Sequence, residues 1–371
     1  MRHYSPKILC CVLVALVAVV PAAAQTPQLT DVFVSGQGGY HTYRIPSLLV
    51  TKKGTALVFC EGRRDSRSDD GNNDVLLRRS TDGGKTWEKV QLVYEEGGES
   101  DTTIGNTCPV LDRHTGTIWL FMNRDNDAVL VSKSSDDGRT WSKPLDVTSQ
   151  TKKPAWGWYA TGPGVGIQLT RGKHNGRLVI PCDHRETKNR SGPSLSHMIY
   201  SDDHGKTWQL GESVGPHTNE CQVAELADGR LIVNCRNHWG RSGKRPDLAG
   251  RRVIAYSSDG GHSWSEPEFD DTLIEPQCQA SLVSIPDKPN ALLFSNPASR
   301  TGREKMTVRL SLDGGSTWKH SRLLYEKSSA YSCLGILADG RAAIIFERDN
   351  YSRLSFAVFP LEWLRNSSVK K

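Results

Sequence analysis

An eight-residue phrase, Ser-x-Asp-x-Gly-x-Thr/Ser-Trp, occurs five times and constrains the fold of this chain more than any other feature of its sequence. The copies begin at Ser80, Ser134, Ser201, Ser257 and Ser311. An Asp that bonds its own backbone, followed by a Gly that accepts a positive φ, is typical of a hairpin turn, and the Trp would open the next strand. Five such turns predict a repeated antiparallel unit.

The spacing of the phrase predicts the number of units. Its copies begin 54, 67, 56 and 54 residues apart, which is a period typical of propeller blades. The first unit reads as strands at 45–50, 56–61, 75–79 and 87–93. The last unit lacks the phrase and offers strands at 332–337, 342–347 and 354–359, so a strand at 31–34 would complete it. We therefore predict an all-β, six-bladed β-propeller closed by the N-terminal strand.

The N-terminus predicts export. Arg2 and Lys7 precede an apolar stretch at 8–20, and small residues end at Ala24, as in a cleaved secretory signal. We expect a signal at 1–24, one propeller domain at 25–371 with no attached carbohydrate-binding domain, and a secreted or periplasmic location without stable membrane insertion after cleavage. An uncleaved membrane anchor is the alternative, although the stretch is shorter than the roughly 20 residues that a span needs.

Composition excludes several classes of protein and partner. The chain has 371 residues, of which 37% are hydrophobic and 24% charged, so it is neither disordered, collagenous nor a multi-span membrane protein. Lys and Arg number 47 against 41 Asp and Glu, without a basic run, so no nucleic-acid partner is expected.

The cysteines and the motif inventory predict no cofactor. The cysteines after the signal show no CxxC pair, so they form neither a disulfide framework nor a zinc site, and most should be small buried hydrophobes. They are Cys60, Cys108, Cys182, Cys221, Cys235, Cys278 and Cys333. One or two disulfide bridges stay open as an alternative. No metal cluster, phosphate loop or dinucleotide fingerprint occurs, and scattered acids leave a structural Ca²⁺ open.

Blade geometry selects the candidate site residues. In an antiparallel blade, the start of strand one and the loop between strands two and three lie on the face opposite the repeated turn. Eight residues whose side chains could bind a ligand or take part in a reaction fall on that face. They are Arg44, Glu220 and Tyr331 at strand-one starts, Arg236 and Glu347 at strand-two ends, and Arg63, Asp69 and Arg303 in the loops. Taken alone, an arginine is usually a solvated surface residue and a tyrosine usually packs, so the prediction depends on their coincidence on one face.

These residue types suit an acidic substrate. Several guanidinium groups with few compensating acids bind a carboxylate or a phosphate through paired hydrogen bonds. Asp69 is a candidate general acid for a leaving oxygen, and Tyr331 with Glu220 as its base is a candidate nucleophile. A neutral phenol suits an electrophilic carbon that itself carries a carboxylate, because a carboxylate nucleophile would be repelled.

The motifs around these residues resemble those of the bacterial exo-α-sialidase (neuraminidase) family, over essentially the whole chain after the signal. The motifs are Tyr43-Arg44-Ile45-Pro46, Glu61-Gly62-Arg63 with Ser68-Asp69, Asn219-Glu220-Cys221-Gln222, Asn234-Cys235-Arg236, Arg303 before Met306, Ala330-Tyr331-Ser332 and Phe346-Glu347. The resemblance implies a six-bladed propeller with Asp-box repeats that hydrolyses terminal α-linked sialic acids from glycoconjugates with retention of configuration.

The resemblance also implies a role for each residue. Three arginines, Arg44, Arg236 and Arg303, would bind the substrate carboxylate, Glu347 would steady Arg44, and Arg63 would bind a ring hydroxyl. By the same resemblance, Tyr331 with Glu220 would attack the anomeric carbon, and Asp69 would protonate the leaving sugar and then activate water. Asn106 and Gln279 are further candidates for substrate contact.

Some assignments have alternatives. Asp70 competes with Asp69, Arg64 with Arg63, and Arg300 or Arg309 with Arg303. The segment 156–162, which holds two tryptophans, either walls the pocket or packs within a blade. A trans-sialidase or an intramolecular trans-sialidase would share every candidate residue. A catalytically inactive sialic-acid-binding propeller would tend to lose Asp69, Glu220 or Tyr331, and an assembly module would need none of the arginines. The sequence gives no prediction of linkage preference or oligomeric state.

Overall fold

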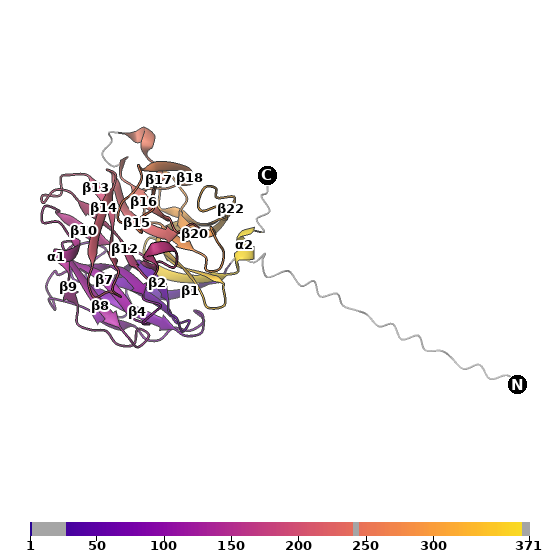
Figure 1. The fold of residues 1–371 in the computed structure, drawn as a ribbon. Helices are drawn as coiled ribbons and strands as arrows, with labels where there is room; N and C mark the ends of the chain where they lie inside the picture. Colours follow the sequence, from indigo (N-terminus) through magenta and orange to yellow (C-terminus); the bar gives the residue numbers. More distant parts are fainter. Residues whose placement is uncertain (2–26, 240–244, 366–371) are drawn as a thin grey trace.

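The computed structural model describes residues 1, 27–239 and 245–365, so the predicted signal at 1–24 lies outside the described residues except for Met1. The chain is all-β, and its sheets are arranged like the blades of a propeller (Figure 1). Within the described residues no helix combines the length and the apolarity that crossing a membrane requires.

Four of the hydrogen-bonded sheets have four or five strands. The first contains β2 (Thr42–Val50), β3 (Ala56–Arg63), β4 (Asn73–Ser80) and β5 (Gln91–Tyr94). The second contains β6 (Ile104–Leu111), β7 (Ile118–Arg124), β8 (Ala128–Ser134) and β9 (Leu145–Asp146). The third contains β10 (Trp158–Thr161), β11 (Ile167–Gln168), β12 (Leu178–Arg185), β13 (Ser194–Ser201) and β14 (Gln209–Val214). The fourth contains β15 (Thr218–Glu225), β16 (Leu231–Asn237), β17 (Arg251–Ser257) and β18 (Glu268–Ile274).

The fifth sheet has seven strands. In spatial order these are β1 (Leu29–Val34), β24 (Arg353–Phe359), β23 (Ala342–Arg348), β22 (His320–Ile336), β21 (Glu304–Ser311), β20 (Leu292–Pro297) and β19 (Ser281–Ser284). The predicted six blades are therefore not six separate hydrogen-bonded sheets in the described chain, because β22 pairs with β21 up to Ser328 and with β23 from Ser329 onward. β1 pairs antiparallel with β24, and Figure 1 shows it beside the C-terminal strands.

The short helical elements lie in the connections: α1 (Thr148–Thr151), η2 (Gly172–His174), η4 (Pro246–Leu248) and α2 (Leu361–Arg365).

The inner strands are buried on both faces, which explains their continuous apolar sequences. All eight residues of β3 are buried, whereas β5 and β18, at the outer edges of their sheets, are largely exposed or half-buried. Apolar side chains fill the space between neighbouring sheets, and Phe59 is fully buried there. Burial of one such side chain contributes about 1.5–3 kcal/mol.

The repeated phrase forms a self-bonded turn, as predicted. In the first copy the Ser80 hydroxyl donates to Asp82 at 2.8 Å and accepts from the Gly84 amide at 2.9 Å, while the Thr86 hydroxyl and amide both donate to Asp82. The other four copies repeat this set. Gly84 has φ +88°, so its backbone conformation favours glycine.

The tryptophan of the phrase lies before the fourth strand, and the predicted strand at 87–93 is therefore wrong at its start, since β5 begins at Gln91. The Trp87 ring instead packs edge-on against Phe356 of β24, with ring centroids 5.1 Å apart. Packing between sheets thus decides the position of this residue. The seven cysteines of the described chain are free and buried, as expected for small hydrophobes.

Candidate active site

The sheet register places the predicted site residues at one end of the strands. In the first sheet Thr42 pairs with Arg63 and Arg44 with Glu61, whereas Val50 pairs with Ala56 at the other end. Ala56 in turn pairs with Ser80, where the repeated turn begins. The predicted site and the repeated turns therefore occupy opposite ends of the sheets, as the blade argument requires.

The first strand of several units is irregular where it carries a site residue. The register of β2 shifts after Arg44, and that of β6, β15 and β22 shifts across the segments holding Asn106, Glu220 and Tyr331. Ile45 and Asn106 have φ values of +57° and +53°. Such bulges interrupt the alternation of a strand and redirect a side chain. The sequence reasoning did not predict these irregularities.

Glu347 ties three strands together beneath the site. Its carboxylate is fully buried, and its Oε1 accepts hydrogen bonds from Arg44 Nε at 2.6 Å and from the Ile45 amide at 2.9 Å. Its Oε2 accepts from the Tyr331 amide at 3.1 Å. Burial disfavours the charge on Arg44, but Glu347 outweighs this effect and raises the pKa of Arg44. Arg44 is therefore a fixed cation with its outer nitrogens turned toward the site.

Tyr331 is bonded to a carboxylate and to a guanidinium. Its hydroxyl donates to Glu220 Oε1, and Arg236 Nη1 donates both to the Tyr331 oxygen at 3.1 Å and to Glu220 Oε2 at 2.7 Å. Burial and the negative charge of Glu220 raise the pKa of Tyr331 well above its ordinary value, against the opposing effect of Arg236 and Arg303. Tyr331 is consequently a neutral phenol in hydrogen-bond contact with a carboxylate.

Two further guanidinium groups lie over the face of the Tyr331 ring. The Arg44 and Arg303 guanidinium carbons are 5.6 Å and 5.5 Å from the ring centroid. Together with Arg236 at the hydroxyl, three cations surround one tyrosine, while two carboxylates, those of Glu220 and Glu347, are bonded among them. Three guanidinium groups held in this way are suited to binding a small carboxylate.

Arg63 connects a buried carboxylate with an exposed one. Its guanidinium donates to Glu61 Oε2 through Nε at 3.1 Å and through Nη2 at 2.7 Å, and its Nη1 donates to Asp69 Oδ1 at 2.8 Å. Nη1 also donates to the carbonyls of Arg67 and Ser68, which fixes the loop that carries Asp69.

Asp69 is ionised in this arrangement. Its side chain is 73% exposed, and Arg44 Nη1 lies 3.8 Å from the same oxygen that Arg63 contacts. Local desolvation opposes ionisation of Asp69, but the charges of Arg63 and Arg44 outweigh it and hold the pKa below its ordinary value. An anion placed against Arg44 would offset part of that positive field and raise the pKa of Asp69.

Asn106 and Gln279 are placed differently from the arginines. The Asn106 amide nitrogen donates to Glu61 Oε1 at 2.8 Å, so its backbone supports the Glu61–Arg63 pair. Gln279 is 1% exposed, and its side chain donates to the carbonyls of Pro163 and Ser332 and accepts from the Ser332 amide. The Gln279 side chain thus braces the strand that carries Tyr331, and its predicted contact with substrate stays a prediction.

The alternative arginines and Asp70 make other contacts. Arg64 Nη2 donates to Asp74 at 2.6 Å, Arg300 Nη1 donates to the Gly250 carbonyl, and the buried Arg309 donates to Asn296. Asp70 lines a separate cavity of about 280 Å³. None of these contacts is made with Tyr331 or Arg44, whereas Asp69 contacts Arg63 and Arg44, and Arg303 lies over the Tyr331 ring, so the geometry favours Arg63, Arg303 and Asp69 over their competitors.

The segment 156–162 contributes to packing. Trp156 is 5% exposed and stacks on His184 with ring centroids 3.4 Å apart, and Tyr159 is fully buried. Both belong to a core cluster between neighbouring sheets. The packing alternative therefore holds for these two residues.

Two residues of the site were missed by the sequence reasoning. Glu61, which holds Arg63, stands in the quoted Glu-Gly-Arg motif, so its proximity to Arg63 was visible, although its burial was not. Tyr351 contacts both Arg44 and Arg303 from the hairpin between β23 and β24. A tyrosine that follows an Asp-Asn pair is the only signal that marks Tyr351.

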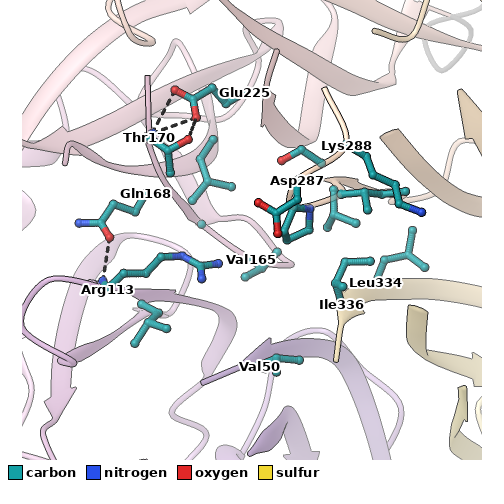
Figure 2. A pocket seen from close by; sticks show the side chains of 18 of the residues that line it. Val50, Arg113, Val165, Gln168, Thr170, Glu225, Asp287, Lys288, Leu334 and Ile336 are labelled. Carbon is teal, nitrogen blue, oxygen red and sulfur yellow. Dashed lines mark hydrogen bonds between the residues drawn. The ribbon is translucent and has the colours of Figure 1, made fainter. Parts of the chain in front are cut away.

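A cavity of about 390 Å³ opens at the other end of the strands, and none of the predicted site residues lines it. It is formed by the ends of first strands, including Val50 and Ile336, with Val165 and the Arg113 side chain pointing into it (Figure 2). Glu225 at its edge is bonded to Thr170. This cavity and the predicted site residues thus lie at opposite ends of the strands.

Comparison with known proteins places the chain among similar sequences and structures. The family profile described as "BNR repeat-like domain" matches residues 54–344. A protein of Micromonospora viridifaciens named "Sialidase" is 37% identical over 362 residues, which cover 90% of this chain and 54% of that protein. "Sialidase-2" of Mus musculus is 30% identical over 368 residues, which cover 87% of this chain and 93% of that protein. The chain therefore spans little more than half the length of the Micromonospora relative.

A solved structure named "Hadza microbial sialidase Hz136" has a TM-score of 0.81 to this chain with 30% sequence identity. The superposition covers 91% of this chain and 69% of that protein. The two structures therefore share the propeller-like arrangement of sheets over 91% of this chain.

Proposed function

The chain belongs to the sialidase family with BNR repeats, and from this premise we propose that it is an exo-α-sialidase, which hydrolyses terminal α-linked sialic acids on glycoconjugates. One observation carries the proposal: three guanidinium groups, those of Arg44, Arg236 and Arg303, surround the hydroxyl and ring of Tyr331. A sialic acid presents a carboxylate on its anomeric carbon. Such a cluster of arginines would bind that carboxylate and bring the carbon to the phenol.

In the first step Tyr331 would attack the anomeric carbon. The Tyr331 oxygen forms a bond to that carbon, its proton passes to Glu220, and the bond from the carbon to the aglycone oxygen breaks. The hydrogen bond between Tyr331 and Glu220 supports this transfer. The raised pKa of Tyr331 means that the phenol is neutral until the attack, so it does not repel the substrate carboxylate.

Asp69 would protonate the departing oxygen and then take a proton from water. Its lowered pKa in the free protein fits the second task directly, since a general base must be ionised. For the first task, the substrate carboxylate would weaken the positive field of Arg44 at Asp69 and raise its pKa. Water would attack the sialyl-tyrosine carbon and release sialic acid, with the phenol proton returned from Glu220.

We also propose six structural units, closed into a ring by β1. The pairing of β22 with β21 over its first half and with β23 over its second half supports a division of the seven-stranded sheet into two units. The pairing of β1 with β24 would complete the second of them. Export through a signal at 1–24 is likewise a proposal, supported by the basic start and apolar stretch of the sequence.

The test is the release of 4-methylumbelliferone from its α-sialoside by the purified chain, with Tyr331→Phe as the matched control. We expect turnover in the wild type that disappears in the variant, with free sialic acid as the product by chromatography. Absence of turnover in a folded wild-type protein would contradict the proposal. A product in which sialic acid has been transferred or internally condensed would replace hydrolysis with trans-sialidase chemistry.

A further inference from the structure

Tyr351 touches two of the three arginines that surround Tyr331. The Arg44 guanidinium carbon lies 4.1 Å from the centroid of the Tyr351 ring, within the range of a cation–π contact. The Tyr351 hydroxyl oxygen accepts a hydrogen bond from Arg303 Nη1 at 3.2 Å. One side chain therefore contacts cations that come from β2 and from the loop before β21.

The two arginines differ in how much else holds them. Arg44 is anchored by Glu347 at 2.6 Å, whereas among the described residues the Arg303 side chain makes one further hydrogen bond, a 3.4 Å contact from Nη2 to the Gln277 carbonyl. Arg303 carries a long side chain, whose ordering costs conformational entropy. Loss of the Tyr351 hydroxyl would therefore free Arg303 more than Arg44.

The backbone at Tyr351 is unfavourable for a tyrosine. Asp349, Asn350 and Tyr351, between β23 and β24, have φ values of +52°, +53° and +68°. Asp and Asn adopt this left-handed conformation readily, but a bulky aromatic residue does so rarely and with strain. Tyr351 is half-buried and packs against a small core cluster that includes Ile45 and Tyr331, although asparagine or glycine would fit its backbone conformation better.

The loop is held in this conformation by its neighbours. The Ser35 hydroxyl donates to the Tyr351 carbonyl at 2.8 Å, and the Asp349 amide donates to the Ser328 carbonyl at 2.9 Å. Strained residues that the surrounding structure holds in place occur preferentially at ligand sites.

We propose that Tyr351 is a positioning residue, which orients Arg44 and Arg303 toward the same substrate carboxylate before the substrate arrives. The inference rests on the proposed sialidase function and adds a residue to its binding site. Because both arginines would hold the carboxylate in the bound substrate and in the transition state alike, Tyr351 should act on binding far more than on the chemical step.

The test compares Tyr351→Phe with Tyr351→Asn. The Phe variant keeps the ring under Arg44 and loses the hydrogen bond to Arg303, and we expect KM and the inhibition constant of 2-deoxy-2,3-dehydro-N-acetylneuraminic acid to rise about three- to tenfold. The Asn variant loses both contacts and should raise these constants about 30- to 100-fold. In both variants kcat should stay within about threefold of the wild type.

Tyr325→Phe is the matched control. The Tyr325 hydroxyl donates to Asp349 in the same hairpin, but it contacts none of the three arginines around Tyr331. This variant should leave KM unchanged. The Tyr351→Asn protein should melt within about 2 °C of the wild type, because relief of the backbone strain offsets the lost packing.

Each outcome has a distinct meaning. An active wild type whose KM is unchanged in Tyr351→Asn overturns the inference while leaving the sialidase proposal intact. An equal rise in KM for Tyr325→Phe, or a large fall in kcat or melting temperature for Tyr351→Asn, overturns it as well, because Tyr351 would then be structural. A folded wild type that neither hydrolyses the sialoside nor binds the inhibitor removes the proposed function and this inference together.

Discussion

The end of the sheets that carries the repeated turns and the end that carries the arginines are built in opposite ways. Each repeated turn is closed by hydrogen bonds between residues at most four positions apart, such as Ser80 with Gly84. At the other end Arg44 bonds to Glu347, 303 positions away, and Tyr331 bonds to Glu220, 111 positions away. The turns are local and occur five times, whereas the site is assembled once from distant segments.

This difference between the two ends predicts which property of the protein a substitution should change. A turn packs between sheets and contributes to stability, and the loss of one turn leaves four others. The arginine end contains polar contacts that no other part of the described chain duplicates. Substitutions at the two ends should therefore separate into effects on stability and effects on activity.

The largest expected effect is that of Tyr331→Phe. Loss of the phenol oxygen removes the proposed nucleophile, and we expect kcat to fall about 10³-fold or more, equivalent to about 4 kcal/mol in the activation free energy. The melting temperature should change little, because the ring remains. Steady-state kinetics with the fluorogenic sialoside measure the effect. Near-normal turnover would remove Tyr331 from the nucleophile role.

Arg236→Ala comes next. The change removes a donor to the substrate carboxylate and leaves the partly buried Glu220 without its cation, so we expect carboxylate inhibitors to bind about 10²-fold more weakly, about 3 kcal/mol. Titration calorimetry with a sialic acid analogue measures the affinity. Arg236→Lys is the matched control, because it keeps the positive charge but loses the paired hydrogen bonds of a guanidinium group. Its affinity for the inhibitor should lie between those of the wild type and the Ala variant. Unchanged affinity in the Ala variant would contradict the role of Arg236.

Gly84→Ala tests the opposite end. A Cβ at Gly84 would lie 2.1 Å from Cε1 of the buried Phe356, and the φ of +88° disfavours any side chain. We expect a loss of about 2–3 kcal/mol in the free energy of unfolding and a melting temperature about 3–4 °C lower, with kcat unchanged at 25 °C.

Gly83→Ala is the control for the effect of φ alone. Gly83 has a similar φ of +75°, but a Cβ there would meet nothing closer than 3.6 Å. Gly83→Ala should lower the free energy of unfolding by about 1 kcal/mol, as expected for an alanine forced to a positive φ. Equal losses for Gly83→Ala and Gly84→Ala would show that the contact with Phe356 contributes nothing, and reduced kcat in either folded variant would contradict the separation of the two ends.

The smallest expected effect is the pH dependence of one turn. Burial opposes ionisation of Asp136, but hydrogen bonds from Thr140 and Ser134 outweigh it and lower the pKa of Asp136 from 3.8 to about 2. Because the pKa is lower in the folded protein, this stabilisation is present above pH 3.8 and disappears as the pH falls through about 2. Asp136→Asn should lower stability by about 1 kcal/mol at pH 7.

Thermal melts of Asp136→Asn and wild type between pH 2 and pH 7 measure the effect. The difference in melting temperature should shrink toward zero at the acid end, because protonated Asp136 and asparagine are then both neutral. A difference that stays constant with pH would contradict the assignment of the stabilisation to the ionised carboxylate.

Much of the fold could be predicted because its signals are local. The expected strands at 342–347 and 354–359 differ from β23 and β24 by one residue at an end. Apolar alternation and turn residues act over a few positions, so the sequence displays them directly. The start of β5 was missed because the contact of Trp87 with Phe356 lies between sheets.

The candidate site was predictable in part. Position on the strands placed Arg44, Glu220 and Tyr331 at one end, since strand direction alone decides the end. The hydrogen-bond partners of the site residues could not be predicted from the sequence. Gln279 turns its side chain toward Pro163 and Ser332, and Tyr351 contacts Arg303 from a hairpin that no sequence pattern distinguished. No simple sequence pattern indicates the bulges that redirect Glu220 and Tyr331, because the bulges depend on how the strands pair.

The sequence by itself determined the repeated turn, the antiparallel unit and the end of each unit at which the reactive side chains stand. Each of these follows from residues within a few positions of one another, whose conformational preferences hold in any context. The tertiary structure alone decided that Glu347 holds Arg44, that Glu220 bonds to Tyr331 and that Tyr351 contacts two arginines. Those contacts depend on how whole sheets pack and where strands shift register, and only the folded chain brings the groups within hydrogen-bond distance.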